Sequence, residues 1–405
     1  MLTPDYLWYV PEKAEKQAEE LHNKIVSVII ERMMIRLGRG EDYLFTPIDK
    51  WQIDVLQDAG YILQAVQKEI AQTTKIGIDT IAKTMKEAGI KAIEWDDAVY
   101  KKAGLEPTPL NESPYMQRLI QRNYEKTKGE MQNFTGTMPN ACHDNYIKAV
   151  DKAYTQTASG TTGYTQAVKE AVNDIINSGA DVTYPSGHRD SIETATTRAV
   201  RTGVSQMAGE ITDARMDEMN WDIILTSAHL GARIGNGGDN LTNHFWWQGK
   251  FYSKSGNDPR FPPFSVCGMG NVQGIHGANC RHSHGPGDGI NNPFEDYDSE
   301  ENRKEYEKRK RQRELERRIR KTKRQLIGMK TAVDNAKDEA LKHDLDMEYQ
   351  KKAALLQKQN KAYNDYCEKN NLKKQSERLN TADWNRSQAS SARGAATRYN
   401  NARGK

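Results

Sequence analysis

The chain has 405 residues, of which 36% are hydrophobic and 28% charged, and its mean hydropathy is -0.87. This polar composition excludes one compact globule and indicates about two or three domains with long solvated helices. No run approaches the roughly 20 apolar residues that a membrane-spanning helix needs, so we expect no membrane contact. The formal net charge of +4 indicates nucleic-acid binding only if the basic residues are clustered.

Two further features of the sequence concern the cellular compartment of the protein. The first residues lack the basic start and apolar run of a signal peptide, so we expect a soluble, unexported protein. Four cysteines are too few for a disulfide framework in a chain of this length, and we expect them to be reduced.

The N-terminal part of the chain predicts helices separated by short breaks. Apolar residues recur at helical spacing over 11–37. Thr46 and Pro47 predict the cap and the first turn of a second helix, and a third helix is expected over 75–88. We therefore assign 1–106 to an N-terminal helical region.

A second helical region is predicted at 107–219. Prolines at 107, 109 and 114 interrupt the helical pattern and mark its start. A helix over 116–131 is expected to end before a turn at 136–140, which contains Gly and Pro. The helices predicted after this turn cover 140–157, 162–178 and 188–219.

The composition changes at residue 220. Residues 221–226 predict a short strand, and the segment that follows is rich in Gly, His, Trp and Asn. Five of the nine histidines and two of the four cysteines lie within 220–290. We therefore predict a compact α+β module at 220–290, in a chain whose fold class is otherwise mainly α.

A long basic coiled-coil helix is predicted over 299–375, followed by a flexible tail at 376–405. Between Arg303 and Lys330 there are fourteen Lys and Arg residues and four Asp and Glu residues. Apolar residues recur at alternating steps of four and three, which is the heptad pattern of a seam that favours self-association. The seam consists of Leu315, Ile319, Thr322, Leu326, Met329, Val333, Ala336 and Ala340.

The basic helix lacks the acidic partners that usually balance a solvated coiled-coil flank. A polyanion would neutralise it through counterion release, although an acidic protein surface would also fit. The residues predicted to contact DNA or another polyanion are Lys308, Arg309, Lys310, Arg311, Arg313, Arg317, Arg318, Arg320, Lys321, Lys323 and Arg324.

Three motifs of the module resemble the phage minor capsid protein 2 family, which is similar to the phage Mu F-like head morphogenesis proteins. They are Thr-Ser-Ala-His-Leu-Gly-Ala-Arg at 226–233, Trp-Gln-Gly-Lys-Phe-Tyr-Ser at 247–253 and Gly-Ala-Asn-Cys-Arg-His at 277–282. Family members often have a proline-containing link between the first two motifs, whereas residues 234–242 form a Gly/Asn-rich insert here.

The resemblance implies a structural protein of a tailed-bacteriophage head, present in few copies in virions and procapsids. The partners it implies are the portal protein, capsid or scaffold proteins and packaged double-stranded DNA. It places the protein in the capsid interior, and in the host cytoplasm during assembly. The resemblance implies no enzymatic activity.

The residues themselves leave two readings of the module open. Cys267, His276, Cys280 and His282 supply a ligand set that suits Zn²⁺, but their spacing matches no standard finger. Packed thiols and hydrogen-bonded imidazoles are the alternative, so no cofactor is assigned beyond candidate zinc. Other candidate ligands are His229, His244 and His284.

Function also has alternatives from other classes. His276, Asn279 and His282 loosely resemble the His and Asn of metal-dependent nucleases, and the basic helix alone would suit a non-specific DNA-binding protein. No complete set of nucleophile, base and charge stabiliser is evident, so we predict no catalytic residues. Residues expected to build the module or contact a partner are His229, Gly231, Arg233, His244, Trp247, Gln248, Gly249, Asn279 and Arg281.

Overall fold

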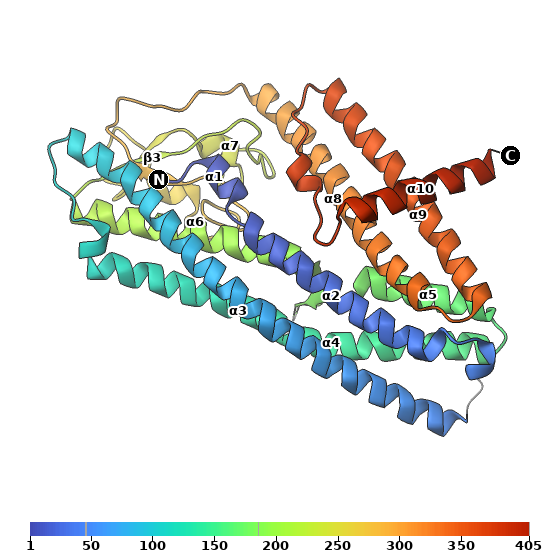
Figure 1. The fold of residues 1–405 in the computed structure, drawn as a ribbon. Helices are drawn as coiled ribbons and strands as arrows, with labels where there is room; N and C mark the ends of the chain where they lie inside the picture. The colour runs from blue at the N-terminus through green and yellow to red at the C-terminus, as the bar shows by residue number, and fades with distance from the viewer. Residues whose placement is uncertain (45–46, 185, 405) are drawn as a thin grey trace. The chain divides into compact units, whose positions relative to one another are not determined.

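The computed structural model describes residues 1–44, 47–184 and 186–404 (Figure 1). These residues are mainly helical and include one two-stranded and one three-stranded antiparallel sheet. The predicted fold class, mainly α with a small α+β module, is confirmed. None of the helices in the described ranges is long and apolar enough to cross a membrane.

The chain forms two compact units, each built from three separate stretches. Their boundaries fall inside long helices, so the division does not follow the chain in order. The five consecutive regions predicted from composition describe changes along the sequence, whereas the units describe which residues contact one another. Unit 1 contains Met1–Glu15, Ile76–Gln132 and Thr196–Lys310, and unit 2 contains Lys16–Lys75, Asn133–Ala195 and Arg311–Lys405.

The N-terminal helices are longer and fewer than predicted. After the short α1 (Pro4–Tyr9), α2 (Glu12–Leu37) confirms the helix expected over 11–37. A short 3₁₀ turn, Glu41–Tyr43, is followed by α3 (Ile48–Lys102). This one helix replaces the two that we predicted, because the stretch between them holds no glycine or proline to end it.

Helix α4 (Pro114–Ala158) also continues through a predicted break. It follows a 3₁₀ turn at Leu110–Glu112, and Pro139 lies inside it where we expected a turn. On this helix Met138, Cys142 and Tyr146 are at most 1% exposed and recur every four residues. Burial of this face favours a continuous helix over the local preference of Gly and Pro.

The next elements follow the prediction closely. Helix α5 (Tyr164–Ser178) lies within the expected range. A small hairpin of β1 (Asp181–Thr183) and β2 (Arg189–Ser191) then precedes α6 (Ile192–Glu218). Because the second strand of the hairpin extends to Ser191, α6 begins at Ile192 and not at residue 188 as predicted.

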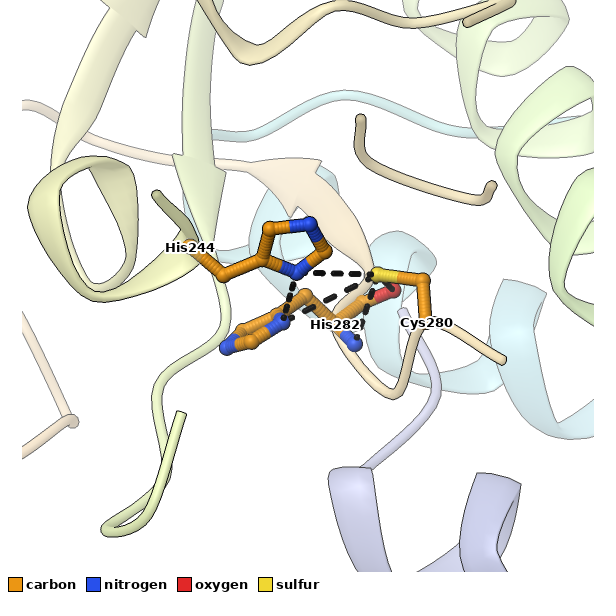
Figure 2. A group of neighbouring side chains, drawn as sticks. All are labelled: His244, Cys280 and His282. Carbon is orange, nitrogen blue, oxygen red and sulfur yellow. Dashed lines mark hydrogen bonds between the residues drawn. The ribbon is translucent and has the colours of Figure 1, made fainter. Parts of the chain in front are cut away.

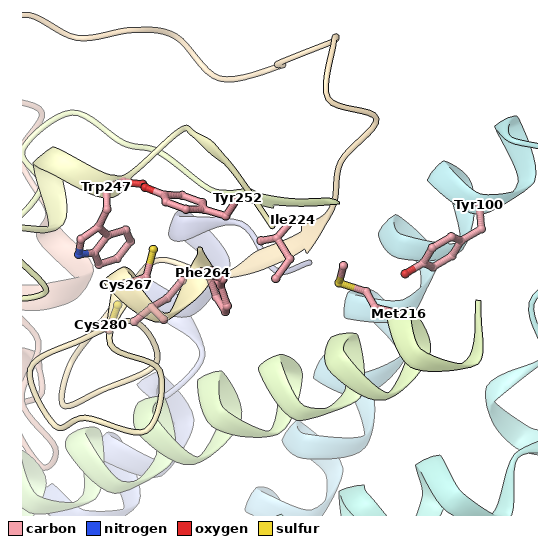
Figure 3. Packing of buried hydrophobic residues seen from close by; sticks show 9 residues of the cluster. Tyr100, Met216, Ile224, Trp247, Tyr252, Phe264, Cys267 and Cys280 are labelled. Atoms are coloured by element: carbon pink, nitrogen blue, oxygen red, sulfur yellow. The ribbon is translucent and has the colours of Figure 1, made fainter. Parts of the chain in front are cut away.

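The α+β module contains a three-stranded sheet in the order β4-β3-β5. Its strands are β3 (Ile223–Thr226), β4 (Phe251–Ser253) and β5 (His284–Pro286), so the predicted first strand is confirmed. Helix α7 (His244–Trp247) and a 3₁₀ turn at Phe264–Cys267 lie in the connections. A buried cluster packs around this sheet in unit 1 (Figure 3) and includes Tyr100, Met216, Ile224, Trp247, Tyr252, Phe264, Cys267, Ile275 and Cys280.

The predicted C-terminal helix is divided into α8 (Ser299–Asn335) and α9 (Glu339–Lys369). Asp338 ends the heptad run by capping α9, where its side chain accepts from the N–H of Leu341 at 2.8 Å. Most of the apolar seam is buried within unit 2, with Ile319 and Met329 at 0% exposure, whereas Val333 is half-buried and Ala340 is exposed. The buried part of the seam therefore holds α8 against its own chain, and self-association of the protein stays a prediction.

The polar tail also has regular structure. A 3₁₀ turn, Ser376–Leu379, precedes α10 (Arg386–Arg403), which packs on α9. Asn385 caps α10 by accepting from two backbone N–H groups, and Ala395 and Ala396 are fully buried. The small alanine face allows close packing, so a helix replaces the flexible tail that the composition indicated.

Candidate metal centre and basic surface

Two histidines and one cysteine meet in unit 1 beside the three-stranded sheet (Figure 2). His244 begins α7, which Asn243 caps by accepting from the N–H of Trp246 at 3.2 Å. Cys280 and His282 lie on the loop that leads into β5. A capped helix and a sheet strand therefore fix the segments that carry the three side chains.

The facing atoms of these side chains form a small triangle. Nδ1 of His244 lies 3.4 Å from Nδ1 of His282. The Sγ of Cys280 lies 3.7 Å from the first nitrogen and 3.8 Å from the second. No other set of three or more His, Cys, Asp or Glu side chains gathers in this way among the described residues.

The outer nitrogen of each ring faces an acceptor. Nε2 of His244 lies 2.8 Å from the carbonyl oxygen of Gln273, and Nε2 of His282 lies 2.9 Å from Oε1 of Gln248. The backbone N–H of His229 donates to the same Oε1 at 3.0 Å, which orients the Gln248 amide. An acceptor requires an N–H opposite it, so each neutral ring carries its hydrogen on Nε2 and leaves Nδ1 bare.

The site is closed to solvent and favours uncharged side chains. His244 and Cys280 are 2% exposed, and His282 is 1% exposed. Burial lowers the pKa of His244 to about 4 and the pKa of His282 well below its ordinary value. Burial also raises the pKa of the Cys280 thiol. Both imidazoles are thus neutral at neutral pH, which is the form that binds metal ions.

Two members of the predicted ligand set lie elsewhere. Cys267 belongs to the hydrophobic cluster (Figure 3), and burial raises the pKa of its thiol to about 12. The His276 ring lies against α6, where Gly209 leaves room for it: a Cβ on that glycine would lie 2.8 Å from Nε2 of His276. The structure gathers His244 with Cys280 and His282 instead.

His276 belongs to a buried hydrogen-bonded chain of four residues. Its Nδ1 lies 2.8 Å from Oγ of Ser205, and its Nε2 lies 2.8 Å from Nδ1 of His284. Nε2 of His284 in turn lies 3.2 Å from a carboxylate oxygen of Asp213. Every ring nitrogen in this chain has one donor or acceptor opposite it, so the network is satisfied without an ion.

The first motif of the module is tied to the start of α8. Oδ1 of Asn302 accepts from the backbone N–H groups of Gly231 and Ala232, both at 2.8 Å, and Asn302 is fully buried. Gly231 has a φ of +79°, which favours glycine. The guanidinium of Arg233 donates to the carbonyl of Ala278 at 3.1 Å. Asn302 was not singled out from the sequence, because a lone Asn in a polar helix gives no signal.

The other predicted module residues also make contacts inside unit 1. Gly249 adopts a φ of +62°, and the indole N–H of Trp247 donates to the carbonyl of Leu241 at 3.1 Å. Oδ1 of Asn279 accepts from Arg201 at 3.1 Å. The guanidinium of Arg281 lies 4.8 Å from the ring centroid of Trp8, and the His229 ring stacks on His282 at 4.5 Å. Their contact with a partner stays a prediction.

The eleven predicted polyanion contacts fall into different environments. Arg320, Lys323 and Arg324 turn toward the interior of unit 2: Lys323 is 9% exposed and donates to the carbonyl of Leu379. Lys308, Arg309 and Arg313 are half-buried, and Arg309 pairs with Glu305 at 2.6 Å. The exposed ones are Lys310, Arg311, Arg317, Arg318 and Lys321.

Arg324 contacts two buried acidic residues. Its guanidinium forms an ion pair with Glu193 and lies 3.7 Å from Glu19, and both carboxylates are at most 5% exposed on their side chains. Burial lowers the pKa of the adjacent His22 to about 4, so His22 supplies no charge at neutral pH. Arg320 adds a second cation, 3.8 Å from Glu19. These bases are neutralised within the chain.

Comparison with known proteins gives one finding. The family model described as phage minor capsid protein 2 matches residues 2–365 of the chain. No curated protein and no solved structure matches it.

Proposed function

Because the chain belongs to the phage minor capsid protein 2 family, we propose that this minor capsid protein acts at the portal of a tailed-phage head and contacts the packaged DNA there. The observation that supports the DNA contact is a set of exposed basic residues in unit 2. These residues outnumber the acidic residues beside them. The same surface supports a role in genome packaging or delivery.

The first part of this surface lies on α8. Arg311, Arg317, Arg318 and Lys321, which we call the basic stripe, are all exposed. Arg311 and Arg318 both pair with Glu314, which leaves an excess of three positive charges on the stripe and its acid. Residues 311 and 318, and residues 314 and 321, are one heptad apart, so they follow one side of the helix.

The second part lies on α10. This helix contains four arginines, Arg386, Arg393, Arg398 and Arg403, and no acidic residue. All four are exposed, while the alanine face of the helix is buried. The only charged side chains of this helix are positive, which favours electrostatic binding of a polyanion. Such binding to DNA does not depend on the base sequence.

A structural role is favoured over catalysis by where the titratable groups lie. The Ser205, His276, His284 and Asp213 chain has the order of a nucleophile, a base and an acid, but Ser205 is fully buried, so a substrate does not reach its Oγ. A reacting group must touch its substrate. The exposed basic residues on α8 and α10 bind phosphate without reacting with it.

DNA binding by the full-length chain tests the proposal. Four phosphate contacts from the stripe would give a slope of about −3.6 for log K against log salt, a loss of roughly 100-fold between about 50 and 200 mM salt. Replacing the four stripe residues by Gln is expected to reduce the slope by about one for each phosphate-binding side chain that is removed. Fluorescence anisotropy with random-sequence duplex DNA measures both values.

The matched control replaces four exposed lysines of α3 by Gln and removes the same charge. These lysines are Lys83, Lys86, Lys101 and Lys102. This variant is expected to keep the wild-type slope. An equal loss in both variants would mean that DNA responds only to net charge, and an unchanged slope in the stripe variant would remove the stripe from the interface.

A further inference from the structure

We propose that His244, Cys280 and His282 bind one zinc ion through Nδ1, Sγ and Nδ1, and that this ion joins α7 to the loop before β5. The site is independent of the DNA contact proposed above. Four observations carry it: the size of the triangle, the tautomers of the two rings, the number of hydrogens available and the burial of the site.

The triangle has the dimensions of one face of a tetrahedral zinc site. With bonds of about 2.05 Å to nitrogen and about 2.3 Å to sulfur, tetrahedral ligands lie about 3.3 Å apart for two nitrogens and about 3.6 Å for nitrogen and sulfur. The corresponding distances are 3.4 Å between the nitrogens and 3.7 and 3.8 Å to the sulfur. An ion at the centre therefore requires no large movement of these side chains.

The ring tautomers point the correct atoms at this centre. Because the Gln273 carbonyl and the Gln248 amide oxygen hold the hydrogen on each Nε2, the two Nδ1 atoms face each other with lone pairs only. An outer N–H bonded to a carbonyl or an amide oxygen is the arrangement that orients histidine ligands in metal sites. The backbone N–H of His282 also donates to Sγ of Cys280 at 3.4 Å, which holds the sulfur in place at this centre.

Hydrogen bonds alone do not satisfy this triangle. The Cys280 thiol has one hydrogen for two bare nitrogens, and both N···S distances are near the outer limit for a hydrogen bond to sulfur. The neighbouring chain through His276 and His284 shows the contrast, since each of its ring nitrogens has its own partner. A cation that replaces the thiol hydrogen satisfies all three ligand atoms together.

Burial assigns the ion a structural role. The three ligands are at most 2% exposed, so they offer a substrate little access to the ion. No further His, Cys, Asp or Glu of the described residues joins the group, so the fourth tetrahedral position has no assigned protein ligand. One thiolate and two imidazoles suit zinc among the common divalent ions, while Mg²⁺ and Ca²⁺ prefer oxygen. An ion at this position would stabilise the fold of the module by joining two of its segments.

Metal content of the full-length chain tests the site directly. Protein purified without chelator and dialysed against zinc is expected to hold about one zinc ion per chain by plasma mass spectrometry. After zinc removal, Co²⁺ is expected to produce the charge-transfer absorption of a thiolate–cobalt bond. Gln248→Leu leaves every ligand in place but removes the acceptor for His282, and should weaken zinc binding about 10–100-fold.

Two cysteine variants separate a ligand from a packed thiol. Cys280→Ser is expected to lose the zinc and the charge-transfer band, whereas Cys267→Ser, equally buried but outside the triangle, should keep both. If Cys280→Ser fails to fold, the spectra of the wild-type protein and of Cys267→Ser still show whether a thiolate other than Cys267 binds the metal. Wild-type protein without zinc and without a thiolate band would overturn the proposal, as would a folded Cys280→Ser variant that retains the band.

Discussion

Replacing Arg324 by Met is expected to destabilise unit 2 by about 3–5 kcal/mol, because Glu193 and Glu19 would lose the cation that pairs with both of them. Both carboxylates are buried, so water does not compensate the missing positive charge. Urea unfolding followed by circular dichroism measures the change in the free energy of the first cooperative transition.

Arg317→Met is the matched control for this experiment. Arg317 lies one heptad earlier on α8 and is exposed, so its replacement is expected to change stability by less than about 0.5 kcal/mol. In the double variant Glu193→Gln with Arg324→Met, part of the stability should be recovered, since one of the uncompensated charges is gone. Equal stabilities for the two single Met variants would show that Arg324 has no interior role.

Ile319→Ala is expected to cost about 2–5 kcal/mol, the usual range for removing a large side chain from a packed core. Ile319 has no exposed surface, and it lies on the seam that faces the interior of unit 2. Because the seam is covered within one chain, the loss of stability should not depend on protein concentration. Thermal unfolding at low and high concentration measures it.

The control for this prediction is Val333→Ala, near the half-buried end of the same seam, where the cost should be smaller. A loss of stability that grew on dilution would instead place Ile319 between copies of the chain. That result would support self-association through the seam, which the heptad pattern favours.

The sequence predicted the element types well and their ends less well. Helical spacing identified α2, α5 and α6, because each buries one apolar face. The break expected near Pro139 was wrong because burial of Met138 and Cys142 outweighs the local preference of proline. A heptad pattern shows that one helix face is covered, but it does not show whether the covering surface belongs to the same chain.

The sequence placed the candidate metal ligands in the correct segment of the chain, but the structure groups them differently. Cys280 and His282 share a short motif and lie together, whereas His244 lies 36 positions before Cys280 and joins them only through the fold. That these residues bind zinc stays a proposal. The acceptors that orient the rings include the backbone carbonyl of Gln273, which no sequence pattern can indicate. The basic run was likewise recognised as a whole, but burial alone separates Arg324 from Arg317.

The assignment to the portal is tested most directly by counting copies of this chain in purified particles. Quantitative mass spectrometry would compare virions and procapsids with particles assembled without the portal protein. We expect few copies in the first two and none in the third, because the proposed attachment point is absent there. Copies that persist at the same number in portal-less particles, or absence of the chain from virions and procapsids alike, would contradict the account.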